Sequence, residues 1–176
     1  MIDFSRNHFE LFGLPTRFRL DPDMLDRAYR ELQNAVHPDR FAAAAETERR
    51  LALQSSARVN EAYTALKDPV TRAQYLLTLH GIDALAETDS ALPVEFLERQ
   101  LARREAADDA MTARDTRTLQ SLLVAVRADA AGLEQRLAEM LDDEADREAA
   151  RLLLREFKFL AKLGRDIDAM LGELEG

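Results

Sequence analysis

The residues best suited to chemistry are His37 and Asp39, which flank Pro38 in the stretch AVHPDRF at residues 35–41. A histidine two residues from a carboxylate could be a general base with its orienting acid, part of a metal site, or part of a binding loop. Pro38 disfavours the helical conformation for His37, so a preceding helix should end near Val36 and leave both side chains exposed. Exposed loops commonly carry function.

Catalysis and metal binding gain little support from the rest of the chain. The 176 residues include no cysteine, which excludes disulfides, thiolate metal ligands, cysteine nucleophiles and directly ligated iron–sulfur clusters. No serine has a nucleophile signature such as G-x-S-x-G. The other two histidines, His8 and His80, do not have ligand spacing to His37. We therefore predict a protein that is not an enzyme and that holds no metal or cofactor.

The composition predicts an all-α protein, since 47% of the residues are hydrophobic and 32% charged, with few glycines and prolines. No stretch approaches the roughly 18 to 20 apolar residues of a membrane span, and the N-terminus lacks a signal-peptide pattern. We expect a cytoplasmic protein with no membrane contact. The net charge of −9 falls entirely in residues 81–176, which hold 13 basic and 22 acidic side chains against 11 of each in residues 1–80. Nucleic-acid binding is therefore not expected.

Helical periodicity predicts an antiparallel hairpin in the first 80 residues. Asp21 and Pro22 form a cap-and-start signal for a helix over 22–36, and apolar residues spaced three and four apart recur in that helix and in a second one over 46–67. Short helices are predicted in HFELFGL, at residues 8–14, and over 69–79. Because each long helix must bury its apolar stripe on the other, the HPD loop lies at the tip of the hairpin.

These elements resemble a J-domain over roughly residues 4–76. The resemblance rests on a helix ending AYRELQNAVHPDRF and a later helix containing ARVNEAYTALKDPVTRAQYLL. In that family the HPD loop and the helix before it dock on a DnaK-type chaperone and stimulate its ATPase. The resemblance implies as chaperone-binding residues His37, Pro38, Asp39, Arg27, Arg30 and Arg40. Arg40 stands where the family usually has lysine.

Two interpretations of Arg27 and Arg30 stay open at this point. Either arginine could pair with a partner surface and steer association, or it could lie on a solvated helix face in pairs such as Arg27 with Glu31. Asp23 and Asp26 on the same helix make its basic face thinner than the family pattern suggests.

Residues 93–176 predict a three-helix bundle, with helices over 93–111, 115–142 and 145–174 and a linker over 81–92. The segments FELFGLP, RAQYLLTLHGI, FLERQLARRE and LLREFKFLAKL make the whole chain resemble the bacterial type of HscB co-chaperone of iron–sulfur cluster assembly. The resemblance implies a J-domain over 1–80 that recruits the chaperone HscA and a bundle that binds the scaffold protein IscU.

By position in that family, the scaffold-binding residues are Leu97, Leu101, Glu105, Asp109 and Phe159. Phe157 and Phe159 lie about 200° apart on an ideal helix, so both cannot face one narrow core stripe. The sequence departs from the family pattern at Glu98, where an apolar residue is favoured, and at Ala102, where an acid is favoured. Ordinary core packing of the apolar residues and plain solvation of the acids are the competing interpretations.

The sequence therefore predicts a non-enzymatic co-chaperone with an N-terminal J-domain hairpin and a C-terminal three-helix bundle. One alternative is a J-protein that uses its bundle as an adaptor for another client. The other is a helical structural protein in which HPD is only a turn. We expect His37→Gln to abolish ATPase stimulation and to leave the fold and scaffold binding intact, because the loop and the bundle belong to separate modules.

Overall fold

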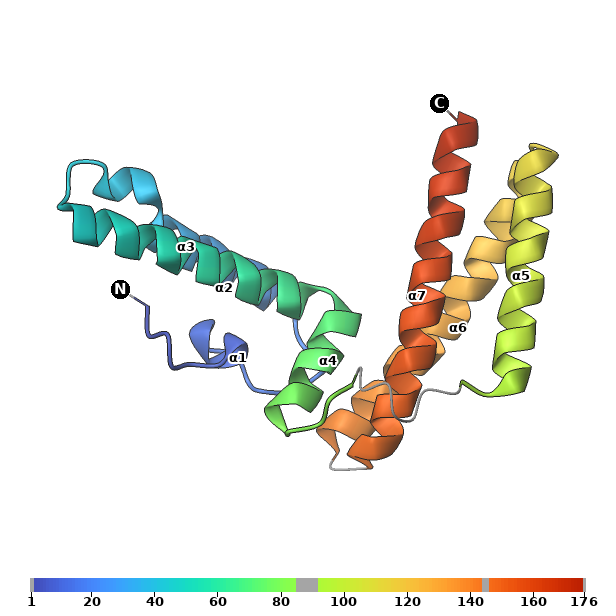
Figure 1. Cartoon of the computed structure of the whole chain (residues 1–176), viewed down its shortest axis with the longest axis horizontal. Coiled ribbons are helices and arrows are strands. Elements are labelled where there is room, and N and C mark those ends of the chain that lie inside the picture. Colours follow the sequence, from blue (N-terminus) through green and yellow to red (C-terminus); the bar gives the residue numbers. More distant parts are fainter. Residues whose placement is uncertain (1, 85–91, 144–145, 176) are drawn as a thin grey trace. The chain divides into compact units, whose positions relative to one another are not determined.

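The structure is a computed structural model that describes residues 2–84, 92–143 and 146–175 (Figure 1). These residues contain helices and loops and no strand, which confirms the predicted all-α fold. The chain divides into two compact units, residues 1–76 and 77–176. Most of the predicted linker, residues 85–91, lies outside the described residues, and the domain limits at 80 and 93 remain predictions.

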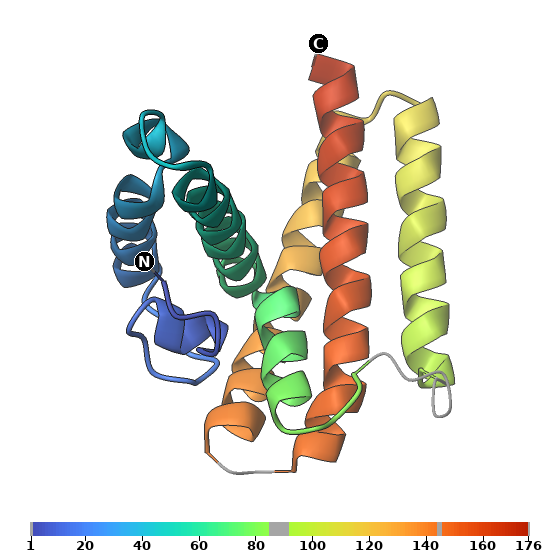
Figure 2. The ribbon, with the colours of Figure 1, turned by 60° about the vertical axis from the view of Figure 1, so that its left-hand side comes forward.

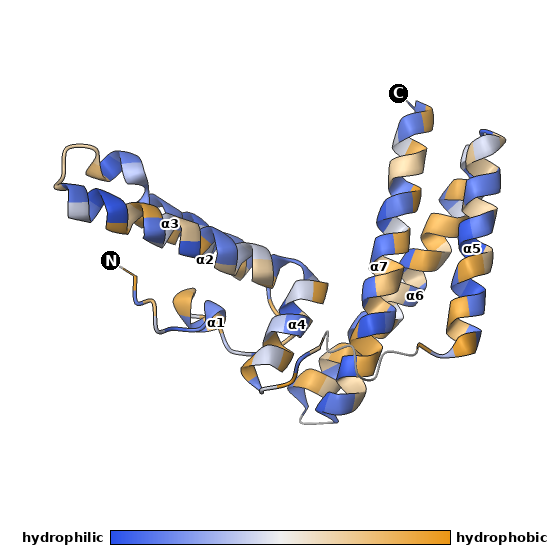
Figure 3. Cartoon of the chain, in the orientation of Figure 1, coloured by the Kyte–Doolittle hydropathy of each residue, from blue (hydrophilic) through white to orange (hydrophobic). Residues whose placement is uncertain are grey.

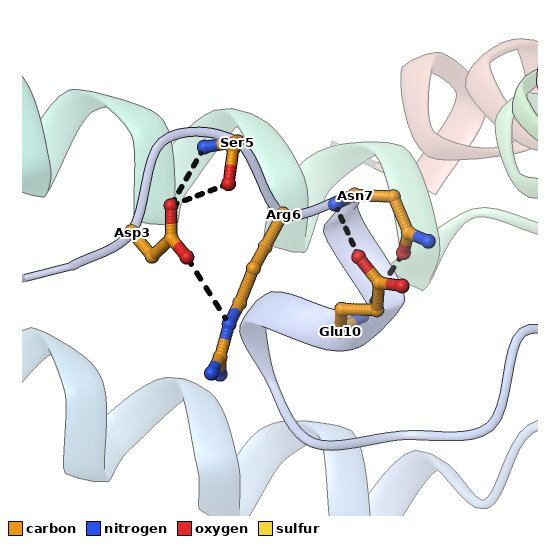
Figure 4. A network of polar contacts seen from close by, with 5 residues as sticks. All are labelled: Asp3, Ser5, Arg6, Asn7 and Glu10. Atoms are coloured by element: carbon orange, nitrogen blue, oxygen red, sulfur yellow. Dashed lines mark hydrogen bonds and ion pairs between the residues drawn. The ribbon is translucent and has the colours of Figure 1, made fainter.

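The first unit begins with the short helix α1 (His8–Leu11), which a capping box holds in place. The Asn7 side chain accepts a hydrogen bond from the Glu10 backbone N–H at 3.0 Å, and the Glu10 carboxylate accepts one from the Asn7 N–H at 2.9 Å (Figure 4). Just upstream, the Ser5 hydroxyl and N–H donate to Asp3, and these bonds lower the pKa of Asp3. The helix ends before Gly13, whose φ of +65° favours a residue without a Cβ.

The hairpin consists of α2 (Pro22–Val36) and α3 (Glu46–Lys67), joined through the short 3₁₀ helix η1 (Pro38–Phe41). Asp21 caps α2 by accepting from the N–H groups of Asp23 and Met24. Helix α4 (Pro69–Leu79) follows directly, so the predicted spans 22–36, 46–67 and 69–79 are confirmed.

The core of the first unit lies where α1, α2 and α3 meet. Its most deeply buried large side chains are Phe9, Phe18, Leu25, Val59 and Leu66. Arg72 closes one side of this core, because its guanidinium lies 4.8 Å from the Phe18 ring centroid and donates to the Leu66 carbonyl at 2.8 Å. The tip of the hairpin is therefore presented by two helices that are fixed at their opposite ends.

The second unit contains α5 (Val94–Thr112), α6 (Thr116–Asp142) and α7 (Arg147–Glu175), close to the predicted limits. Helices α5 and α7 run in one direction and α6 in the other (Figure 2). The α6–α7 pair forms the main contact, and Gly164 faces Val126 within it, since a Cβ at position 164 would make an ordinary contact of 3.6 Å with the Val126 side chain. Arg114, at a φ of +54°, and the N-cap Asp115 turn the chain from α5 into α6.

Helix α5 packs on this pair through small residues, Ala107 and Ala110, and through Phe96 near its start. Between Phe96 and Ala107 the contact of α5 with the pair is polar, because Gln100 is buried and Arg103 donates to Asp129 of α6 at 2.7 Å. None of the described helices is long and apolar enough to cross a membrane.

Candidate functional site

The HPD loop follows the end of α2 directly. His37 has extended dihedrals, with φ −57° and ψ 127°, and Pro38 opens η1, so the helix ends at Val36 as the proline predicts. The side chains of His37 and Asp39 are 54% and 90% exposed. The loop therefore presents both groups to solvent.

A hydrogen bond inside the loop orients the imidazole. The backbone N–H of Asp39 donates to His37 Nδ1 at 3.3 Å, and the Asp39 carboxylate lies 3.6 Å from the same nitrogen. In a catalytic dyad Nδ1 carries a proton and donates it to the carboxylate. Here Nδ1 instead accepts a hydrogen bond from the backbone. The geometry fits a binding loop better than a general base.

Arg40 turns back toward the helix that precedes the loop. Its guanidinium donates to the backbone carbonyl of Asn34 at 3.0 Å. Carbonyls in the last turn of a helix lack an intrahelical donor, and a basic side chain there also interacts favourably with the helix dipole. Arg40 therefore holds the end of α2 and the loop together, in addition to presenting a cation.

Arg27 and Arg30 are exposed on α2, and neither forms an ion pair within the described part of the chain. The pair of Arg27 with Glu31 is therefore not formed. Of the acids on this helix, Asp26 is bonded to Tyr63 of α3, whose hydroxyl donates to it at 2.7 Å. Both arginines keep their hydrogen-bond donors available for a partner.

A polar groove between α2 and α3 brings Arg30 and His37 together. It is lined by Tyr29, Arg30, Gln33, Asn34, His37, Ser56 and Asn60. Within it the hydroxyl of Tyr29 donates to Asn60 at 3.0 Å, and the Gln33 amide donates to the same oxygen. Sequence reasoning missed Gln33 and Asn60. Both helices carry many other polar residues, so the sequence offered no signal that singles these two out.

The second candidate site lies on α5 and α7. Leu97, Leu101 and Phe159 are 41%, 58% and 36% exposed, whereas Phe157 is 4% exposed. The two phenylalanines thus face different ways, as their spacing predicts. The Phe159 ring meets Phe96 edge-on, with the centroids 5.8 Å apart, and this contact joins α7 to α5. Figure 3 shows hydrophobic residues gathered at the start of α5.

The predicted acids of this site lie progressively further around α5. Glu105 and Asp109 are both exposed. On an ideal helix Glu105 lies about 80° and Asp109 about 120° from Leu97. The exposed side chains of Leu97, Leu101 and Phe159 define what we call the apolar patch, and around α5 Glu105 lies nearer to Leu97 than Asp109 does. Val94, 64% exposed and one turn before Leu97, extends the patch.

The fold and the HPD loop define a class of protein. A family model described as the DnaJ domain matches residues 7–75, which hold α1, the hairpin and the loop. A second model, described as the HSCB C-terminal oligomerisation domain, matches residues 92–168. The chain is thus a J-domain protein with a helical C-terminal domain.

The chain belongs to the HscB family of co-chaperones. It is 42% identical to the co-chaperone protein HscB homologs of Burkholderia multivorans and Burkholderia cenocepacia, with 99% of each chain covered. The chaperone HscB from Vibrio cholerae superposes with a TM-score of 0.85 at 36% identity, covering 96% of this chain and 99% of the other. Human co-chaperone HscB gives a TM-score of 0.87 at 28% identity, covering 95% and 83%. The predicted resemblance is confirmed.

Proposed function

We propose that the protein is a co-chaperone of iron–sulfur cluster assembly in which the two units bind two different partners. The J-domain docks on an Hsp70-type chaperone of the HscA kind and stimulates its ATPase. The helical domain binds the scaffold protein IscU and delivers it to that chaperone. The observation that best supports this division is that the two exposed candidate surfaces lie within separate compact units.

The chaperone-docking surface consists of His37, Asp39, Arg27 and Arg30. The orientation of the loop supports docking, because Nδ1 of His37 is engaged within the loop while the His37 and Asp39 side chains stay exposed to a partner. The two arginines add positive charge that no intramolecular ion pair in the described residues neutralises. Such charges speed association and fix its orientation more than they add affinity, so docking is expected to weaken with salt.

The client-binding surface is the apolar patch of Leu97, Leu101 and Phe159. Three large apolar side chains exposed together on one face are typical of a protein-binding site. Phe96 supports Phe159 from below, so the patch is preorganised rather than formed on binding. Glu105 of α5 can pair with basic groups of the scaffold.

Steady-state ATP hydrolysis by the cognate HscA-type chaperone tests both halves of the proposal. The native protein is expected to stimulate hydrolysis with or without IscU, and His37→Gln to abolish stimulation in both conditions while IscU still binds. Leu97→Ala with Leu101→Ala is the matched variant. It should lose IscU binding and keep the stimulation measured without IscU. Loss of both functions in either variant would refute the division into two binding units.

A further inference from the structure

A row of cations runs along the outward face of α7 beside the apolar patch. Lys158, Lys162 and Arg165 are all exposed and are spaced by four and three residues, so they lie on one side of the helix. The chain has only three lysines, and two of them are in this row. The row stands out because residues 81–176 carry 13 basic against 22 acidic side chains.

These cations are not neutralised within the protein. In the described ranges, none of the three forms an ion pair, although acids are abundant. Like charges four residues apart on a helix repel each other, so Lys158 and Lys162 destabilise α7 slightly. A fold that merely needed solubility would intersperse the two signs of charge. An anionic partner would relieve the repulsion.

The row borders a groove between α5 and α7. Its polar lining consists of Arg104 from α5 and of Lys162 and Asp166 from α7. Its apolar lining is Ala107, Leu163, Ile167 and Met170. Arg104 is exposed and forms no ion pair with any described residue. The groove thus has an apolar floor and two cations against one carboxylate.

The groove continues the apolar patch described above. Arg104 lies one turn beyond Leu101 on α5, and Lys162 lies one turn beyond Phe159 on α7. Because the two helices run in the same direction, both steps lead the same way along the molecule (Figure 2). A chain segment bound on the patch can therefore extend into the groove.

We propose that this basic groove, lined by Arg104 and Lys162 and flanked by Lys158 one turn earlier on α7, binds an acidic segment of the client protein next to the apolar segment that covers the patch. The inference rests on the proposed function and adds the charge of the client's contact region. A client carboxylate would meet cations that form no ion pair with any described residue. A nucleic acid or an anionic membrane would extend over a wider surface and meet the surrounding acids, among them Glu105 and Asp109.

Zero-length carbodiimide crosslinking gives a site-resolved test on the full-length protein with IscU. The reagent joins lysine amines to carboxylates in direct contact, and Lys67 serves as an internal control because it lies in the other unit, bonded to the Tyr63 hydroxyl at 2.7 Å. We expect crosslinks from Lys158 or Lys162 to Asp or Glu of IscU and none from Lys67. A complex that forms but crosslinks through neither α7 lysine would overturn the inference.

The second test measures the affinity for IscU at several ionic strengths. Lys158→Glu with Lys162→Glu should weaken IscU binding about tenfold at low ionic strength and much less at high ionic strength, because salt screens exposed charges. Arg136→Glu is the control, since Arg136 is an exposed cation on α6 in a separate groove with α5. Equal affinities of the lysine variant and the control would overturn the inference.

The two tests also distinguish this inference from the proposed function. If native protein binds IscU and the lysine variant binds equally well, the groove fails and the patch remains. If native protein does not bind IscU at all, the proposed function fails and the basic groove loses its client. Binding of native protein to phosphatidylglycerol vesicles that the lysine variant loses, with IscU affinity unchanged, would assign the cations to a membrane and overturn the inference.

Discussion

Phe159 is partly buried and partly exposed, which makes Phe159→Ala the most informative substitution in the second unit. The side chain is 36% exposed, so about two thirds of its surface is already buried in the free protein. Full burial of a phenylalanine is worth about 1.5–3 kcal/mol, and two thirds of that is about 1–2 kcal/mol. The edge-on contact with Phe96 adds about 0.5–1.5 kcal/mol.

We therefore expect Phe159→Ala to lower the free energy of unfolding by about 2 kcal/mol. Leu160 is the matched control, because it is the next residue of α7 and is 2% exposed in the core. Leu160→Ala should cost about 2–5 kcal/mol through the lost contacts and the cavity left behind. Urea unfolding followed by circular dichroism measures both values.

IscU binding should rank the two variants in the opposite order. Phe159→Ala removes a patch residue and should weaken binding at least tenfold, whereas Leu160→Ala should bind nearly normally at temperatures where it stays folded. Titration calorimetry well below both unfolding midpoints makes the comparison. If Phe159→Ala cost as much stability as Leu160→Ala and left IscU binding unchanged, Phe159 would be a core residue and our interpretation would be wrong.

Three further predictions concern the supports of the fold and the loop. Burial lowers the pKa of His8, so the unfolded chain binds the proton more readily than the folded protein does. The free energy of unfolding should therefore fall as the pH drops below about 6.5. Urea unfolding at pH 7.5 and 5.5 should show that His8→Phe flattens this dependence. Arg40→Gln should speed amide exchange in the last turn of α2 several-fold and reduce ATPase stimulation, because it loses the bond to the Asn34 carbonyl; Arg40→Lys should preserve part of both. Gly164→Ala should raise the free energy of unfolding by about 0.5–1 kcal/mol, because an added Cβ would make only ordinary contact, whereas a thermal midpoint that fell would show that α6 and α7 need the close approach.

Local signals in the sequence account for most of the fold. Asp21-Pro22 and Pro38 set the two ends of α2, and Asp68-Pro69 separates α3 from α4, because a proline restricts the residue before it and is tolerated in the first turn of a helix. The spacing of apolar residues then identifies the buried faces. These effects act over a few residues, which is why a single sequence reveals them.

Features that depend on the exact path of the chain and on neighbours distant in sequence were not predictable in the same way. Arg40 was expected only as an exposed cation, and its bond to Asn34 requires the actual path of η1. The basic groove combines Arg104 with Lys162, which are 58 positions apart, and only the packing of α5 beside α7 brings them together.

The way α5 is attached has a consequence for evolution. This helix contacts the α6–α7 pair through a narrow line of residues, chiefly Phe96, Ala107 and Ala110, and most of its remaining side chains face solvent. Replacing an exposed residue usually changes stability by no more than about 0.5 kcal/mol. Exposed positions such as Glu98 and Ala102 can therefore diverge while the bundle stays intact. The sequence along this helix can therefore change independently of folding, and relatives with the same bundle can present different exposed faces on α5.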